Sequence, residues 1–151
     1  MTTADLLLID EHSVIVDTEQ GHAWSALQRT LWRLMAAKPW AAMAARLGAR
    51  DRNASGLPLV EGSSLPGFLV STVQAPAKLS LRGEHRFARY ELAFHVEAVD
   101  RKRSRIGAVT RAAFPGLSGR LYRTIVIRTR GHVIGVRLVL RSVKRRAERG
   151  E

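Results

Sequence analysis

Apolar and polar residues follow different spacings along the first third of the chain. Residues 11–17 alternate between the two kinds, which is typical of a half-buried strand. Residues 18–36 carry large apolar side chains three or four positions apart, and this spacing predicts a helix with one apolar face. Pro39 interrupts the pattern, which restarts at Trp40 and stops near Gly48. We therefore expect a strand followed by two short helices.

The next stretch, about residues 49–67, has little periodicity because glycine, proline and serine recur through it. Long segments without regular structure are uncommon in compact domains and often serve a site. We expect either a lid or entrance to a site, or a mobile surface loop with one short edge strand.

From residue 67 onward the alternation has a period of two. It predicts two short strands up to residue 82, a long strand over 84–98 and a return strand over 106–114. The charged segment 100–104 joins the last two strands as a hairpin tip. The expected structure is an antiparallel sheet with one wet face.

Helical spacing returns at the C-terminal end, where apolar residues recur over about 118–147 with arginines between them. Gly131 and Gly135 each lower helix stability by about 1 kcal/mol relative to alanine, so we expect close packing there or a bend. No repeat or linker divides the sequence. The prediction is a single α+β domain over residues 1–151.

Composition narrows the function classes. The chain has no cysteine, which excludes disulfides, thiolate nucleophiles and Cys-ligated zinc. No apolar stretch approaches the roughly 20 residues that cross a bilayer, so no integral membrane insertion is expected. A short apolar run at residues 6–9 lacks a basic leader, and we expect a cytoplasmic protein.

The formal net charge is +12, and it is concentrated near the C-terminus. From Arg120 onward there are ten basic and two acidic residues, which supply +8 of that charge. This excess indicates either weak association with polyanions such as anionic membrane or nucleic acid, or simply a solvated helix face. The predicted basic surface comprises Arg101, Lys102, Arg103, Arg123, Arg130, Arg137, Arg141 and Lys144.

The order of these elements resembles the START-like superfamily, which includes Bet v 1 allergens, polyketide cyclases and many uncharacterised bacterial proteins. The resemblance spans nearly the whole chain and is carried by residues 14–17 leading into 24–27, by Pro66-Gly67-Phe68, by the hairpin 84–114, and by residues 116–122 followed by His132. That final segment is similar to one uncharacterised bacterial branch. The resemblance implies a helix-grip fold, in which a curved antiparallel sheet wraps around a long C-terminal helix.

The resemblance also implies a cavity between sheet and helix that holds a small apolar or aromatic molecule or a lipid. The alternative is a packed core in which tyrosine hydroxyls bond locally. The expected cavity lining is Phe68, Val70, Tyr90, Leu92, Phe94, Thr110, Tyr122, Val126, Thr129 and Val133. Apolar walls with a few hydroxyls are the usual composition of a small-molecule site.

Motifs for catalysis are few. The five histidines form no metal-binding pattern, and neither a nucleophile elbow, a phosphate loop nor a dinucleotide fingerprint occurs, so no metal or cofactor is expected. Tyr122 and His132 are the candidates for acid–base chemistry. The sequence therefore leaves three functions open: a binder of a hydrophobic ligand, a polyketide cyclase or aromatase-type enzyme, and a basic surface for anionic membrane or nucleic acid.

Overall fold

The computed structural model describes residues 6–51, 53–129 and 131–150, and the side chains of 126–131 lie outside that description. Strands and helices follow one another in the predicted order. Their bounds are β1 (Leu7–Val16), α1 (Gln20–Met35), α2 (Lys38–Arg46), β2 (Ser64–Leu65), β3 (Phe68–Gln74), β4 (Lys78–Glu84), β5 (Arg89–Ala98), β6 (Ser104–Ala113), α3 (Gly116–Thr129) and α4 (Gly131–Glu148).

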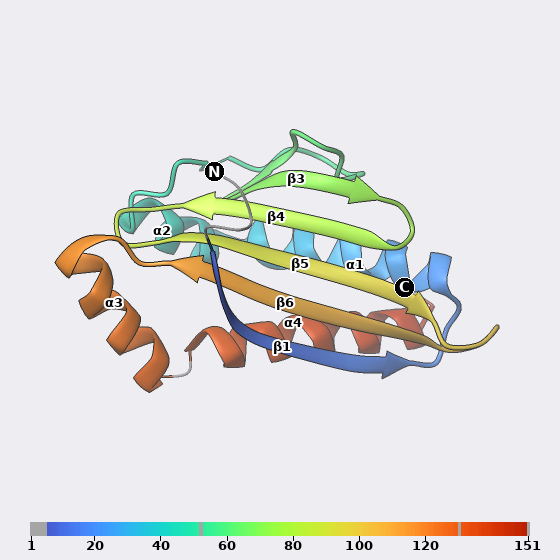
Figure 1. Cartoon of the computed structure of the whole chain (residues 1–151). Helices are drawn as coiled ribbons and strands as arrows, with labels where there is room; N and C mark the ends of the chain where they lie inside the picture. The colour runs from blue at the N-terminus through green and yellow to red at the C-terminus, as the bar shows by residue number, and fades with distance from the viewer. Residues whose placement is uncertain (1–5, 52, 130, 151) are drawn as a thin grey trace.

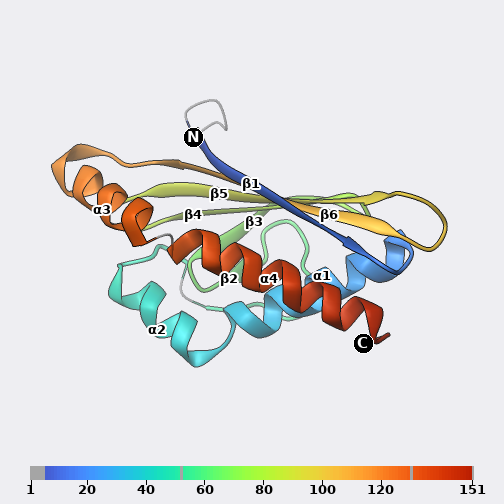
Figure 2. The same ribbon diagram turned by 90° about the horizontal axis from the view of Figure 1, so that it is seen from below.

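The six strands form one antiparallel sheet in the order β1-β6-β5-β4-β3-β2. The first strand therefore pairs with the last one and becomes an edge, while the strands from β2 to β6 form a meander. Figures 1 and 2 show the sheet curving over α1 and α4, which lie together on one of its faces. The predicted α+β class, the two short helices and the curved sheet around a C-terminal helix are confirmed.

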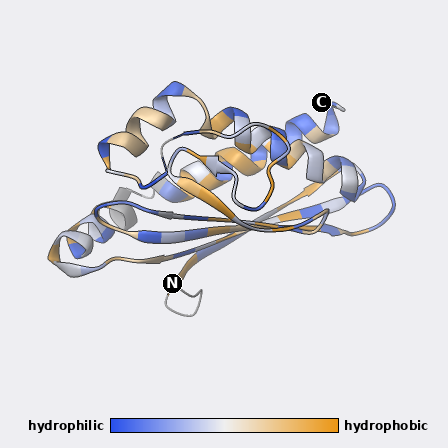
Figure 3. Ribbon diagram, turned by 90° about the horizontal axis from the view of Figure 1, so that it is seen from above, coloured by the Kyte–Doolittle hydropathy of each residue, from blue (hydrophilic) through white to orange (hydrophobic). Residues whose placement is uncertain are grey.

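The core lies between this face of the sheet and the two helices. Alternate side chains of β5, such as Phe94 and Val96, meet Leu27 and Leu31 of α1 and Val143 of α4 in one buried cluster. Burying a side chain of this size contributes about 1.5–3 kcal/mol. Figure 3 shows the same division, because apolar stretches in orange gather where helices and strands face one another.

Polar contacts fasten the C-terminal half of α4 to the end of β1. The Lys144 ammonium donates to the Ile15 carbonyl oxygen at 2.9 Å and pairs with the Glu148 carboxylate at 2.5 Å. The same carboxylate accepts from the Asp17 backbone N–H at 3.1 Å. The hydrogen bond from Lys144 lowers the pKa of Glu148 below its ordinary value. These contacts set the position of α4 along β1.

The prediction of one C-terminal helix over 118–147 is wrong, because the structure has two helices, α3 and α4. Arg130 between them lies outside the described residues. Gly131 and Gly135 weaken the helix locally, and α3 is held to the end of the sheet by a close approach at Gly119. A Cβ there would lie 2.7 Å from the Phe114 carbonyl carbon and 3.1 Å from the Phe87 carbonyl oxygen. Figure 2 shows the change of direction between the two helices.

The segment 49–67 contains the two-residue edge strand β2 near its end, as one of the two alternatives predicted. Its described residues are also attached to α1. The Trp32 indole N–H donates to the Ser55 carbonyl oxygen at 2.7 Å, and the Leu59 N–H donates to the Gln28 side chain at 3.2 Å. Leu59 is fully buried. This segment therefore covers α1 and extends the core.

Within the described ranges, no helix combines the length and the apolar character that crossing a bilayer requires.

Gly83 gives a direct test of this packing. It pairs with Tyr90 across β4 and β5, and a Cβ at this position would overlap the Tyr90 ring and the Gly67 carbonyl oxygen. We expect Gly83→Ala to lower the free energy of unfolding by about 2–3 kcal/mol, measured by urea denaturation. The control is Gly135→Ala, where a Cβ meets nothing within 4 Å; it should stabilise the protein by up to about 1 kcal/mol. Equal stability of the two variants would contradict the Tyr90 position.

Candidate functional site

A carboxylate flanked by two imidazoles lies between β1 and the first turn of α4. The Nε2 atom of His12 makes a hydrogen bond of 3.2 Å to Asp10 Oδ2, and the Nε2 atom of His132 lies 2.8 Å from the same oxygen. The three side chains are 16–22% exposed. The contact between His132 and Asp10 is an ion pair when the imidazole carries a proton. We call these residues the Asp–His cluster.

The sheet places a hydroxyl beside this cluster. Thr110 of β6 stands opposite Asp10 in the register, and Leu92 of β5 stands opposite Thr110. The pairing of β1 shifts between Leu8 and Asp10, so Ile9 is the extra residue of a β-bulge. Such bulges occur often next to functional sites, where they redirect side chains. Neighbouring positions across the sheet therefore carry the Asp10 carboxylate, the Thr110 hydroxyl and the apolar side chain of Leu92.

Several polar atoms of this region are buried and lack a hydrogen-bond partner among the described residues. They are Asp10 Oδ1, Thr110 Oγ1 and both ring nitrogens of His132, whose Nε2 lies 2.8 Å from Asp10 Oδ2 without the geometry of a hydrogen bond. A buried polar group without a partner costs about 1–3 kcal/mol. The protein therefore holds unused hydrogen-bonding capacity at the border of its apolar core.

The geometry suits proton transfer and the binding of a hydroxyl or carbonyl group. A carboxylate beside Nε2 favours the tautomer that carries its proton there, which leaves His132 Nδ1 as an acceptor. An imidazole oriented by a carboxylate is the usual form of a general base. Within the described residues, no group of three or more His, Asp or Glu side chains is placed to hold a metal ion.

Aromatic rings pack around the other acid–base candidate, Tyr122 of α3. Its ring stacks on Phe87 with a centroid distance of 5.4 Å and meets His85 edge-on at 5.1 Å. His85 in turn lies 5.4 Å from Tyr90, whose hydroxyl donates to the Gly67 carbonyl oxygen at 2.6 Å. The Tyr90 hydroxyl is thus bonded locally, as the packed-core alternative predicts.

Burial shifts the titration of this aromatic group. It raises the pKa of Tyr90 far above its ordinary value, with smaller contributions from neighbouring acidic groups, and it raises the pKa of Tyr122. Burial lowers the pKa of His85 below 6.5. Both tyrosine hydroxyls therefore stay protonated, and neither tyrosine suits the role of a base, which would require the tyrosinate form. The His85 imidazole becomes harder to protonate.

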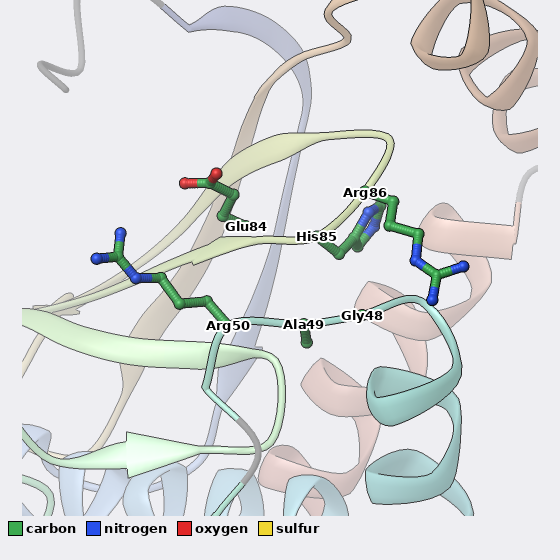
Figure 4. Close-up of a pocket in the computed structure, with 6 residues that line it drawn as sticks. All are labelled: Gly48, Ala49, Arg50, Glu84, His85 and Arg86. Atoms are coloured by element: carbon green, nitrogen blue, oxygen red, sulfur yellow. The ribbon is translucent and has the colours of Figure 1, made fainter.

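A surface hollow of about 560 Å³ adjoins the aromatic group. Figure 4 shows that its walls come from two segments, the loop after α2 (Gly48–Arg50) and the turn between β4 and β5 (Glu84–Arg86). Two backbone hydrogen bonds join these segments, from the Arg50 N–H to the Glu84 carbonyl and from the Arg86 N–H to the Leu47 carbonyl. The hollow is lined by charged side chains and was not predicted from the sequence.

The residues expected to line a cavity fall into three groups. Phe68, Val70, Leu92 and Phe94 belong to the buried core cluster. Thr110, which stands opposite Asp10 in the sheet, and Val133, which follows His132 in α4, are half-buried, and Tyr90 and Tyr122 lie in the aromatic group. The side chains of Val126 and Thr129 lie outside the described residues. The cavity lining therefore stays a prediction.

The predicted basic surface contains two residues in ion pairs and several other exposed residues. Arg103 pairs with Asp100 at 2.9 Å, and Lys144 pairs with Glu148. Arg130 lies outside the described residues. Exposed members remain at the hairpin tip, which is blue in Figure 3, and on the two C-terminal helices; they are Arg101, Lys102, Arg123, Arg137 and Arg141.

Reasoning from the sequence missed Asp10 and His12 as site residues. No histidine had a carboxylate partner at an informative spacing, because the partner of His132 comes from the opposite end of the chain. A signal was nevertheless present. Asp10 and His12 share the face of their strand with Val14 and Val16, so two ionisable groups continue an apolar face.

Comparison with known proteins identifies the fold. No family model and no curated protein matches the sequence. Solved structures do match. One is truncated norcoclaurine synthase from Thalictrum flavum, with a TM-score of 0.57, 11% identity and 93% of each chain covered. Another is the Zhui aromatase/cyclase from Streptomyces sp. R1128, with a TM-score of 0.54, 13% identity and coverage of 93% of this chain and 95% of that one; a conserved protein from Geobacillus kaustophilus matches with a TM-score of 0.52, 14% identity and coverage of 92% and 94%. The chain therefore has the helix-grip fold that these structures share. At these identities the likeness concerns the fold alone.

The lowered pKa of His85 predicts a pH dependence of stability. Because the unfolded chain binds this proton more readily than the folded one, the contribution is complete above pH 6.5 and is lost as the pH falls through the lowered folded value. The free energy of unfolding should fall more steeply between about pH 7 and 5 for the wild type than for His85→Asn. Urea titrations at several pH values measure both slopes. An NMR titration midpoint of His85 at or above 6.5 would contradict the burial of its ring.

Proposed function

We propose that this helix-grip protein binds a small, largely apolar molecule that carries one hydroxyl or carbonyl group. The apolar part would lie on the concave face of the sheet under α4, and the polar group would bond to Asp10, Thr110 and His132. The observation that carries this proposal is the set of buried polar atoms without partners at the edge of the apolar core. A ligand that supplies those hydrogen bonds removes their cost.

The neighbouring side chains support the same assignment. On β6, Ala108 and Ala112 stand opposite the larger Phe94 and Tyr90 of β5, so small residues alternate with Thr110 along the strand next to Asp10. Apolar walls with a few converging polar groups are the usual environment of a small organic ligand. The structural neighbours include an aromatase/cyclase and a norcoclaurine synthase solved with dopamine and hydroxybenzaldehyde, so this fold accommodates aromatic molecules elsewhere.

A pair of compounds of similar shape tests the polar part of this proposal. We expect 2-naphthol to bind about fivefold more tightly than 2-methylnaphthalene, which corresponds to one hydrogen bond of about 1 kcal/mol. His132→Phe should remove this preference while leaving the affinity for 2-methylnaphthalene unchanged. Fluorescence titration measures all four affinities.

The matched control for that experiment is His95→Phe, since His95 alternates with the inward-facing Phe94 and Val96 and so lies on the outer face of β5. This variant should keep the wild-type preference for 2-naphthol. If neither compound binds, the ligand-binding proposal is wrong. If both bind but His132→Phe keeps the preference, the ligand site is elsewhere and only the role of the Asp–His cluster is wrong.

A second candidate function is an enzyme of the cyclase or aromatase type. The observation that favours it is that His132 Nε2 lies 2.8 Å from the Asp10 carboxylate, so an acidic group stands beside the imidazole that would act as the base. Such a base would remove a proton from the carbon next to a ligand carbonyl and return it to another position. Tyr122, with its raised pKa, would act at most as a hydrogen-bond donor.

Exchange of carbon-bound protons tests this activity directly. In D₂O, the protein should accelerate loss of the α-proton NMR signal of 1-tetralone in proportion to its concentration. Asp10→Asn and His132→Gln should reduce the rate at least about 100-fold or to the buffer background, because general-base catalysis contributes about 10²–10⁴-fold. Exchange at the background rate with wild-type protein, while naphthol binding persists, would leave binding as the function and exclude this chemistry.

A further inference from the structure

Helix α3 exposes a stripe of aliphatic side chains. Leu117, Leu121 and Ile125 are 82%, 65% and 52% exposed. They are four residues apart, so successive members are rotated by only about 40° around the helix. We call these three residues the α3 stripe. Exposure of large aliphatic side chains to water is unfavourable. Clustered exposed apolar residues therefore usually mark a contact surface.

The stripe is not the face by which α3 packs on the protein. The packed side contains Gly119, which approaches the Phe114 and Phe87 backbones, and Tyr122, which stacks on Phe87. Figures 1 and 2 show α3 at one end of the sheet, beyond the stretch that α4 covers. The side opposite the packed one is therefore available to a partner.

The surroundings of the stripe are strongly positive. Arg120 and Arg123 are exposed on the same helix, and the sequence has no acidic residue between Asp100 and Glu148. The outer side of α4 repeats this combination on a smaller scale. There, Ile134 and Leu138 are 64% and 51% exposed, with exposed Arg137 and Arg141 beside them.

We infer that α3 docks on the surface of an anionic phospholipid bilayer. The α3 stripe would enter the boundary between headgroups and acyl chains, while Arg120 and Arg123 contact headgroup phosphates. Exposed aliphatic residues flanked by arginines are the sequence pattern of helices that lie in this interface, and each basic residue near an anionic surface adds to the attraction.

Charge and chemistry distinguish this partner from others. A second copy of the chain would bring another strongly positive face against the first, and like charges repel. A nucleic acid would satisfy the arginines, but it would leave aliphatic side chains without the stacking that aromatic rings provide. A surface that is anionic and apolar below its headgroups matches both features. The inference is independent of any ligand under α4.

Paired variants of the full chain test the inference on vesicles of phosphatidylcholine with and without phosphatidylglycerol, at about 0.1 M salt. We expect binding only to the anionic vesicles. Leu117→Gln with Leu121→Gln should reduce the partition coefficient at least about tenfold. The control pair, Leu57→Gln with Val60→Gln, changes exposed apolar residues of the loop after α2 and should bind like the wild type.

A second pair of variants separates local docking from general charge. Arg120→Gln with Arg123→Gln and Arg101→Gln with Lys102→Gln remove the same charge, from α3 and from the β5–β6 hairpin tip respectively. The α3 pair should weaken binding about fivefold per arginine, and the hairpin pair less than about twofold. Equal losses from the two pairs would overturn docking through α3.

Insertion can be followed with one label, because the chain contains no cysteine. An environment-sensitive fluorophore on Leu121→Cys should shift its emission to shorter wavelength on anionic vesicles, and the same label on Val60→Cys should not. Heparin should leave both spectra unchanged. Binding to heparin or to an acidic protein without any shift on vesicles would overturn the membrane assignment. Unchanged thermal unfolding of the variants confirms that their folds are intact.

Discussion

The packing of α4 against β1 and α1 is the constraint on which the candidate site depends. His132 stands in the first turn of α4, so its position over Asp10 is set by the rest of that helix. Val136, Leu140 and Val143 are buried in the core cluster, and Lys144 and Glu148 fix the helix along the end of β1. Hydrophobic burial of this size outweighs the contribution of any single polar contact near the site. The interactions that position His132 in the Asp–His cluster are therefore made mainly by the later turns of α4, some distance from the cluster.

This arrangement explains how one architecture accommodates unrelated activities. The curved sheet and the C-terminal helix supply a buried apolar face, and chemistry depends on which polar residues stand at its border. Here these residues are a carboxylate, two imidazoles and a threonine hydroxyl from β1, β6 and α4. The tyrosines lie in a separate aromatic group and keep their protons, so the two acid–base candidates from the sequence, Tyr122 and His132, have different surroundings in the structure.

Most of the fold could be predicted from the sequence, since each change of apolar spacing coincides with a change of element. The inward positions Val136, Leu140 and Val143 of the last helix also follow from spacing and are buried as predicted. The division into α3 and α4 could not be predicted with certainty of place, because Gly131 and Gly135 indicate either close packing or a bend and the apolar period that continues through Gly131 does not decide between them. Spacing alone also does not identify which apolar face of a helix packs on the rest of the protein. In α3 the face with Tyr122 is packed, whereas the α3 stripe is exposed. The pairing of Asp10 with His132 depends on the β1–β6 register and on helix docking, neither of which is local in sequence.

The position of β1 beside β6 has a consequence for how the protein acquires its site. Asp10 belongs to the first strand and His132 to the last helix, so the contact between them joins segments far apart in the sequence. Contacts of such separation form late, after the local hairpins. A partly synthesised chain can complete the sheet and still lack His132 of the Asp–His cluster. The Asp–His cluster is therefore complete only when the final helix has docked, so completing the fold and completing this cluster become a single event.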